Sequence, residues 1–240
     1  MKSKPIILCS RSLITFDGVE RSYINQAYVK AMNQSGGELV MLTNDVNSDS
    51  QSGLIDIADG ILLTGGADIN PETYNQTPQG YTQKPDDVKD SMDLSLLESA
   101  LDRKLPVLAI CRGMQIVNIY QGGSLFQDVK KEKKDAVQHD FHGKPRSTIS
   151  HQVTLNKNTL LQRILKVDEI GVNSLHHQGI SNLGKELIVA ATTRDWLIEG
   201  VELKDYPFLV GVQWHPEELI ADPTWKRLFD SFVSEASKIK

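Results

Sequence analysis

The chain has 240 residues, of which 40% are hydrophobic and 24% are charged, so it holds enough apolar material for a sizeable buried core. Its formal net charge of −5 argues against a nucleic-acid-binding surface, and no apolar run approaches the roughly 18 residues of a membrane-spanning helix. The first residues, MKSKPIILCSRSL, contain too short an apolar run for a signal peptide, so the sequence predicts a cytoplasmic protein that binds neither nucleic acid nor membrane.

Short apolar runs alternate with helical patterns through the first half of the chain. The predicted strands are 6–10, 38–43, 60–63 and 107–110, and the predicted helices are 21–33, 91–101 and 112–121. This alternation is typical of parallel strands that are joined by helices. The strand 107–110 has almost no polar side chain, which indicates burial on both faces of a sheet.

The second half of the chain has a different pattern. Segments rich in β-forming residues, 148–155 and 187–201, are interrupted by polar residues and separated by a short helical stretch at 159–165. This pattern predicts antiparallel additions to the sheet. The last segment, 225–239, repeats its apolar residues at the spacing of an amphipathic closing helix.

The sequence contains no internal repeat and no linker. We interpret the polar stretches 44–53 and 76–90 as surface excursions, the second of which could form a rim over a site. The prediction is therefore one domain over residues 1–240 with an α/β fold. In that fold a mostly parallel central sheet is flanked by helices in a three-layer sandwich, with a small antiparallel β addition.

Cys111 stands where a predicted strand meets a predicted helix, within VLAICRGMQIVNIYQGG. A sharp strand-to-helix turn lifts such a side chain away from the sheet and points the next backbone N–H into the same space. The turn needs small neighbours, which Ala109 and Gly113 supply. The following helix N-terminus stabilises a thiolate, the form that attacks carbonyl carbon. The alternative is a small buried hydrophobe, which is how we interpret Cys9.

A nucleophilic cysteine needs a histidine to move protons, and the histidine needs a group that fixes its tautomer. An apolar strand ends at His215, and Pro216 favours extended geometry at that residue. Residues two apart in extended chain project to the same side, so Glu217 could orient the imidazole while its other nitrogen faces Cys111. Without Cys111, His215 would be interpreted as a strand-end histidine bonded to a loop.

Paired glycines, Gly65 and Gly66, follow the predicted strand 60–63. Glycines at a strand end let backbone N–H groups approach a ligand closely, as an oxyanion hole requires. The glycine pair alone is weak evidence for an oxyanion hole. The evidence is stronger because the same chain also contains the cysteine turn and the His-Pro-Glu segment.

Taken in chain order, the glycine pair, the cysteine turn and the His-Pro-Glu segment resemble the class I glutamine amidotransferase superfamily. The closer resemblance is to its peptidase C26 branch, which includes gamma-glutamyl-gamma-aminobutyrate hydrolase. LLTGGADINPETY, LAICRGMQIVNIYQGGSLFQD, VNSLHHQGI and VGVQWHPE carry the resemblance, which runs over essentially the whole chain. Two positions depart from the family pattern: Ala109 stands where the family usually has glycine, and Asp93 where relatives commonly carry glutamate.

The resemblance implies a Cys-His-Glu triad and the class I glutamine amidotransferase-like fold. Cys111 would be the nucleophile, His215 the general base and acid, and Glu217 the carboxylate that orients it. The backbone N–H groups of Gly66 and Arg112 would form the oxyanion hole. The residues implied to bind substrate are Gln115, Ser174 and His176.

The histidines in the second half also raise the question of a metal site. Adjacent histidines in a strand point to opposite faces, so His176 and His177 are a poor chelating pair. We predict no metal here and interpret these histidines as part of a pocket wall, together with three others: His139, His142 and His151.

The resemblance implies hydrolysis of the gamma-glutamyl amide bond of a small compound, such as gamma-glutamyl-gamma-aminobutyrate, through a glutamyl thioester. Glutamate and an amine would be released without a cofactor, as in polyamine breakdown, and a homodimer is expected. One alternative is a glutaminase subunit that passes ammonia to a separate synthetase. Another is a non-catalytic binding or redox-sensing protein that uses Cys111 as an oxidisable thiol.

Overall fold

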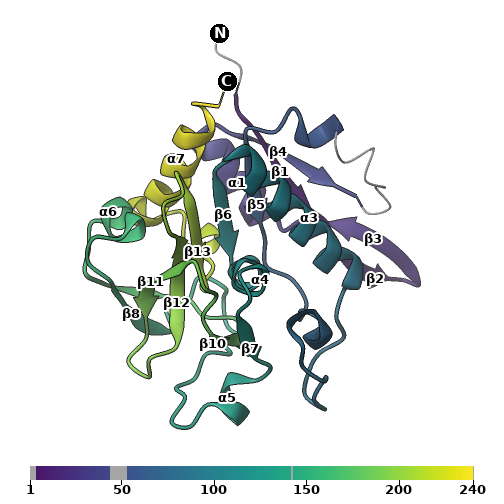
Figure 1. Ribbon diagram of the computed structural model, residues 1–240, viewed down its shortest axis with the longest axis vertical. Coiled ribbons are helices and arrows are strands. Elements are labelled where there is room, and N and C mark those ends of the chain that lie inside the picture. The colour runs from purple at the N-terminus through teal and green to yellow at the C-terminus, as the bar shows by residue number, and fades with distance from the viewer. Residues whose placement is uncertain (1–3, 44–52, 142, 240) are drawn as a thin grey trace.

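The computed structural model describes residues 4–43, 53–141 and 143–239, which are arranged around one eleven-stranded sheet (Figure 1). The main strand order is β4-β1-β5-β6-β13-β12-β11-β8-β9, and β10 and β7 join it through β12. Helices lie on both faces of this sheet, so the predicted three-layer α/β fold is confirmed.

One side of the sheet is parallel and contains the four strands predicted from the first half of the sequence, together with the apolar strand predicted to end at His215. These strands are β4 (Glu38–Leu42), β1 (Ile6–Ser10), β5 (Gly60–Leu63), β6 (Val107–Ile110) and β13 (Leu209–Val212). Each pairs in parallel with its neighbours in that order. Their carboxyl ends therefore meet at one edge of the sheet, which is where open α/β sheets bind ligands.

The other side of the sheet is antiparallel, as predicted, and holds more strands than a small addition. They are β12 (Ile198–Leu203), β11 (Leu187–Thr192), β8 (His151–Leu155), β9 (Glu169–Val172), β10 (Gly179–Asn182) and β7 (Ser124–Phe126). The helix α6 (Leu160–Leu165) confirms the short helical stretch predicted between two of these strands.

Two hydrophobic layers hold the helices to the sheet. The helices α1 (Gln26–Ser35) and α7 (Pro223–Ala236) cover one face, and α3 (Asp87–Arg103) and α4 (Arg112–Tyr120) cover the other (Figure 1). Alternate residues of β6 enter the two layers, because successive strand side chains point to opposite faces. This double burial explains why the sequence of β6 has no polar side.

The predicted helix 21–33 is wrong at its start. Residues 12–23 form a separate hairpin of β2 (Ser12–Phe16) and β3 (Val19–Tyr23), and α1 begins only at Gln26. Asp17 and Gly18 link the strands with positive φ angles of 54° and 71°. An Asp-Gly pair is the strongest short signal for a two-residue hairpin turn, and it outweighs the helical spacing of the residues that follow.

The two polar stretches have different outcomes. Residues 44–52 lie outside the described part of the chain. The stretch 76–90 ends inside a helix, because α3 starts at Asp87.

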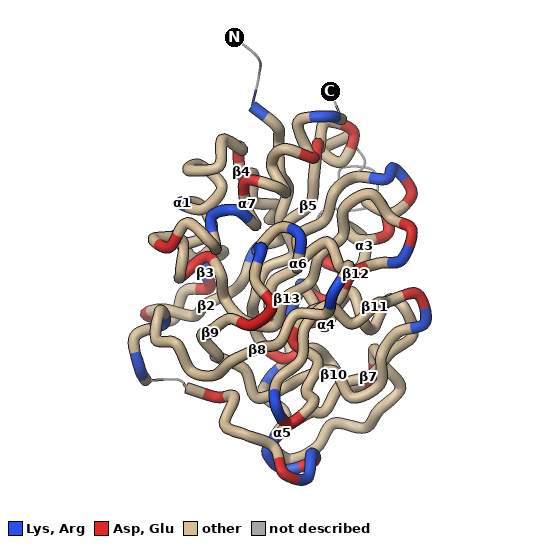
Figure 2. The backbone as a smooth tube through the Cα atoms, turned by 90° about the vertical axis from the view of Figure 1, so that its left-hand side faces the viewer, with Lys and Arg blue, Asp and Glu red and all other residues tan. Residues whose placement is uncertain are grey.

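The basic residues around α5 (Val129–Glu132) lie next to acidic ones at one end of the molecule, as Figure 2 shows. Across the described residues, no helix combines the length and the apolar character needed to cross a membrane.

Candidate active site

Cys111 occupies the turn between β6 and α4 in a rare backbone conformation. Its φ and ψ are 54° and −107°, and its N–H donates to Val212 O at 2.7 Å. A non-glycine residue with positive φ persists only where the surrounding structure determines it. Here the chain is held against the neighbouring strand, since a Cβ at Gly113 would lie 2.4 Å from Leu63 O.

Gly113→Ala is expected to destabilise the protein by about 2 kcal/mol or more, because the added methyl group would collide with a backbone carbonyl. The sign of this stability change distinguishes the collision from helix propensity, since alanine normally stabilises a helix relative to glycine by roughly 1 kcal/mol. Urea unfolding measures the change. Gly80→Ala is the matched control, because a Cβ at that residue would have nothing within 4 Å, and a similar loss there would contradict this account.

His215 comes off the strand next to that of Cys111. Val212 in β13 pairs with Ile110 in β6, so the two strand ends bring both residues to one place. The chain then turns into a short 3-10 helix, η2 (Pro216–Glu218), instead of staying extended as the sequence predicted. This turn still folds Glu217 back, and its Oε1 lies 2.6 Å from His215 Nδ1.

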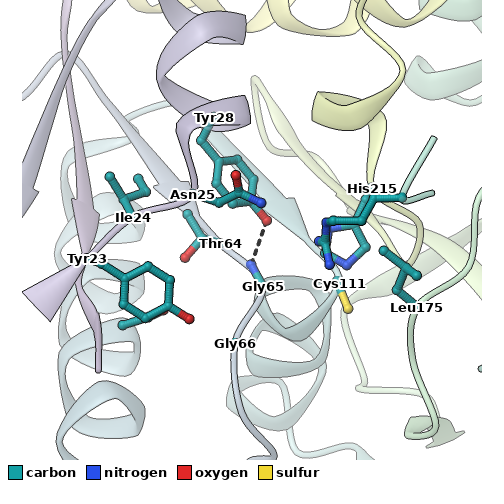
Figure 3. A pocket seen from close by; sticks show the side chains of 12 residues that line it. Tyr23, Ile24, Asn25, Tyr28, Thr64, Gly65, Gly66, Cys111, Leu175 and His215 are labelled. Carbon is teal, nitrogen blue, oxygen red and sulfur yellow. Dashed lines mark hydrogen bonds between the residues drawn. The ribbon is translucent and has the colours of Figure 1, made fainter. Parts of the chain in front are cut away.

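The imidazole of His215 is buried between a carboxylate and a thiol, and Figure 3 shows it beside Cys111. Burial alone would lower the pKa of His215, but the charge of Glu217 and the contact with Cys111 raise that pKa to about 10. The raised pKa favours the protonated ring at neutral pH. A cation in this position stabilises a thiolate on the adjacent sulfur.

The sulfur and the imidazole line a pocket of about 460 Å³. Its other walls come from the end of the β2–β3 hairpin, α1, the paired glycines and two further loops (Figure 3). Polar groups on these walls are supplied by Ser12, Tyr23, Asn25, Tyr28, Thr64 and Arg146. The stretch 76–90, interpreted as a possible rim, contributes no residue to this lining.

Tyr28 is a pocket residue that sequence reasoning missed. Its hydroxyl accepts a hydrogen bond from the Gly65 N–H at 3.0 Å (Figure 3). Burial, followed by the charge of Glu217, raises the pKa of Tyr28 well above its ordinary value, so the hydroxyl stays neutral. Because Tyr28 lies on α1, far from the other site residues in sequence, no local pattern could have identified it.

Gln115 is placed differently from the expectation that it contacts substrate. It is buried outside the pocket lining, where its amide donates to Gln178 O at 3.3 Å and to Gln213 Oε1 at 3.1 Å. Gln213 in turn donates from Nε2 to Cys111 Sγ at 3.4 Å. Gln213 was missed from the sequence, although its position two residues before His215 places it on the same side of extended chain.

Ser174 and His176 also lie outside the pocket lining. The Ser174 hydroxyl donates to His139 O at 2.5 Å, and His176 Nδ1 lies 2.9 Å from Gln178 O. Only Leu175, between them, reaches the pocket. The two residues thus stand behind the pocket wall and hold it in place.

A buried network of charges lies beneath the site. Asp93 accepts from the hydroxyl of Ser10 and from the guanidinium of Arg112, and it lies 3.4 Å from Lys89 Nζ. Asp90 pairs with the same guanidinium. Asp93, the departure from the family pattern, is therefore the centre of a network and not only a packing residue.

Two side chains of this network, Lys89 and Arg112, pack against the backbone of Gly66. A Cβ on Gly66 would lie 3.0 Å from Lys89 Cε and 3.1 Å from Arg112 Cδ, which leaves room only for glycine without rearrangement. Gly65 faces the other way, since its Cβ would lie 2.9 Å from His215 Cε1. The backbone of the glycine pair is thus held between the charge network and the imidazole.

Comparisons with known proteins identify the family of this chain. The sequence model of the peptidase C26 family matches residues 7–217. Protein NtpR of Enterococcus hirae is 36% identical over 227 residues, which is 94% of either chain. Gamma-glutamyl-gamma-aminobutyrate hydrolase PuuD of Escherichia coli K12 is 29% identical over 237 residues, covering 95% of this chain and 91% of the relative.

A solved structure shows the same fold. A GMP synthase-like protein from Thermoplasma acidophilum matches with a TM-score of 0.65 at 19% identity, over 98% of this chain and 95% of that one. The family match covers most of the sequence, including the cysteine turn and the His-Pro-Glu segment. The chain therefore belongs to the peptidase C26 family and is a glutamine amidotransferase-like hydrolase.

Proposed function

We propose that this protein hydrolyses gamma-glutamyl amide bonds through a thioester on Cys111. The observation that carries the proposal is the convergence of a thiol, an imidazole and a carboxylate at adjacent strand ends, with the thiol and imidazole facing one pocket. This is the geometry of nucleophile, base and orienting group that acyl transfer requires. Similarity to gamma-glutamyl-gamma-aminobutyrate hydrolases, at about 30% identity, supports the choice of a gamma-glutamyl substrate.

In the first half-reaction, the Cys111 thiolate attacks the gamma-carbonyl carbon and the carbonyl electrons move onto oxygen. Protonated His215 gives its proton to the amide nitrogen as the tetrahedral intermediate collapses, so the amine leaves and a glutamyl thioester forms. Neutral His215 then takes a proton from water, which attacks the thioester. Glutamate leaves and the thiolate–imidazolium pair is restored.

The oxyanion formed in both half-reactions needs donors that have no other partner. The Gly65 N–H is already bonded to the Tyr28 hydroxyl. The N–H of Arg112 is at the start of α4, where helix N–H groups lack partners within the helix. We assign the oxyanion hole to this group and to the N–H of Gly66, whose backbone the charge network holds.

The pocket also offers a positive charge for the carboxylate of a glutamyl group. Arg146 places a guanidinium at its edge, where it pairs with Glu218 at 2.6 Å, and can attract a substrate carboxylate. Asn25 and Thr64 add neutral polar groups to the lining of the same pocket. These residues, rather than the stretch 76–90, are the proposed determinants of substrate choice.

A partner-free assay tests the proposal. The purified chain is incubated with gamma-glutamyl-gamma-aminobutyrate, glutamine and other gamma-glutamyl amides, and free glutamate is measured. Release from at least one gamma-glutamyl amide without any added protein is expected. Turnover that begins only when a synthetase is added would instead support an ammonia-delivering protein, and equal background rates with wild type and Cys111→Ala would support a non-catalytic role.

Glu217→Gln is expected to move the alkaline limb of the kcat/KM profile to lower pH. The raised pKa of His215, about 10, keeps the ring protonated below that pH, and activity falls as the proton is lost above it. Removing the charge of Glu217 removes one cause of that raised value. The pH dependence of kcat/KM measures the limb in both proteins.

Glu218→Gln is the matched control, because it removes the neighbouring carboxylate, which bonds to Asn25 and Arg146 and not to the imidazole. The alkaline limb should stay near its wild-type position in this variant. An alkaline limb at the same pH in wild type and Glu217→Gln would show that Glu217 does not set the protonation of His215.

A further inference from the structure

Three histidines and a glutamate meet behind the pocket wall, in a place that the proposed reaction does not use. His139, His151, His176 and Glu199 each offer one ligand atom, and these four atoms lie within 4.8 Å of one another. They come from four separate segments, including β8 and β12 (Figure 1). None of the four lines the pocket that holds Cys111.

The three distances from Glu199 are close to the edge of a coordination tetrahedron. Glu199 Oε1 lies 3.4 Å from His139 Nδ1, 3.4 Å from His176 Nε2 and 3.8 Å from His151 Nε2. Four ligands about 2.0 to 2.1 Å from a Zn²⁺ ion would be separated from one another by about 3.4 Å. These separations are long for direct hydrogen bonds, whose usual range is about 2.7 to 3.2 Å.

The same atoms have no hydrogen-bond partner although they are buried. The unpartnered atoms in the cluster are His139 Nδ1, His151 Nδ1, His151 Nε2, His176 Nε2, Glu199 Oε1 and Glu199 Oε2. The Glu199 side chain is completely buried. A buried polar group without a partner costs about 1 to 3 kcal/mol, and more when it is charged, and an ion that takes these atoms as ligands would remove that cost.

The outward nitrogens of two of these rings are held as in known metal sites. His139 Nε2 lies 3.3 Å from Asp195 Oδ2, and Asp195 is fixed by the Val137 N–H at 3.0 Å. His176 Nδ1 lies 2.9 Å from the carbonyl oxygen of Gln178. Metal-binding histidines nearly always donate their second N–H to a carboxylate or a carbonyl, which leaves the other nitrogen free for the ion.

We propose that His139, His151, His176 and Glu199 bind one Zn²⁺ ion in a closed, structural site. Imidazole-rich donor sets favour Zn²⁺ and its first-row neighbours over Mg²⁺ and Ca²⁺, which prefer oxygen ligands. Four protein ligands complete a tetrahedron, so no position is left for a substrate. Two cavities border the cluster: one of about 180 Å³ is lined by His176 and His139, and one of about 490 Å³ is lined by His151, so an ion could reach the site from either.

The ion would fasten the antiparallel part of the sheet to the pocket wall. His176 follows Leu175, which lines the catalytic pocket, and Glu199 O accepts from the N–H of Gln213, whose amide contacts the Cys111 sulfur. The sequence prediction that His176 and His177 point to opposite sides is consistent with this, since His177 instead contacts Asp68 at 2.8 Å. Sequence reasoning missed Glu199, which is one of two acidic residues in β12.

Metal content and spectroscopy test the site independently of activity. The full-length chain, carrying Cys111→Ala to remove the pocket thiol, is stripped with a chelator, given ZnCl₂ and desalted. One Zn²⁺ per chain is expected, with a higher thermal unfolding midpoint than the stripped protein. Co²⁺ in place of Zn²⁺ should give the intense visible bands of four-coordinate nitrogen and oxygen ligation.

His151→Ala and Glu199→Gln in the same background should lose the bound ion and the Co²⁺ bands, whereas His177→Ala, the adjacent control, should keep both. His151→Ala is the gentler change, because neither ring nitrogen of His151 has a hydrogen-bond partner. Less than about a tenth of an equivalent of Zn²⁺ in the folded parent protein would overturn the proposal, as would retention of the ion by folded His151→Ala. If both variants fail to fold, absence of four-coordinate Co²⁺ bands in the parent overturns it, and their presence supports it.

Discussion

Replacing Cys111 with alanine is expected to lower kcat for release of glutamate from a gamma-glutamyl amide by roughly 10⁴-fold or more. The proposed reaction has a covalent intermediate on the sulfur, and neither His215 nor Glu217 can replace the nucleophile. The fold should survive, since the small alanine side chain keeps the turn compact. Steady-state and single-turnover assays measure the loss, and circular dichroism checks the fold.

Cys9→Ala provides the control for this result. Cys9 is fully buried in β1, and burial raises the pKa of its thiol to about 12, so it stays protonated and inert. Its removal should leave kcat within a few-fold of wild type. Turnover by Cys111→Ala at a comparable rate to wild type would contradict the proposed mechanism, whatever the effect of Cys9→Ala.

Asp93→Asn is expected to lower the free energy of unfolding by about 3 to 5 kcal/mol, because it removes the counter-charge of the buried Lys89 ammonium and leaves the Arg112 guanidinium with Asp90 alone. Asp93 is fully buried, accepts a hydrogen bond from the Ser10 hydroxyl, and forms ion pairs with Lys89 and Arg112. The neutral amide cannot balance an ammonium and a guanidinium that are themselves buried. Urea unfolding, monitored by tryptophan fluorescence, gives the change.

An exposed ion pair serves as the comparison. Asp56 pairs with Arg103 at the surface, where their side chains are 63% and 40% exposed. Asp56→Asn should therefore change stability by less than about 1 kcal/mol, since solvent screens such pairs. Equal effects of the two substitutions would show that the network under the glycine pair contributes no more than a surface contact.

The sequence predicted the parts of the fold that depend on residues close together in the chain. The doubly buried strand β6 and the turn at Cys111 follow from an apolar run that ends before Gly113. The hairpin before α1 was missed although Asp17 and Gly18 signal it, because the apolar residues that follow the turn also repeat at helical spacing. The antiparallel half was underestimated, since its strands are short and separated by polar residues.

The site was predictable only where its chemistry lies close together in sequence. The contact between His215 and Glu217 was expected, although a 3-10 turn produces it instead of extended chain. Tyr28 and Gln213 were missed because tertiary packing alone brings them to the glycine pair and the sulfur. The cluster around Glu199 depends on four distant segments, so no spacing in the sequence reveals it.

Other expectations stay predictions. They are the homodimer, the cytoplasmic location, the single-domain organisation and the reaction without a cofactor. His142, considered with the other histidines, lies outside the described residues.

The most direct test uses a glutamine analogue whose gamma-amide is replaced by an electrophilic carbon. Intact-mass spectrometry and peptide mapping should find one label per chain, on Cys111 and not on Cys9. Activity should fall in step with labelling, a gamma-glutamyl substrate should protect against it, and His215→Ala should slow it. Full activity in a completely labelled protein, or labelling elsewhere with Cys111 untouched, would show that this sulfur does not meet the acyl carbon.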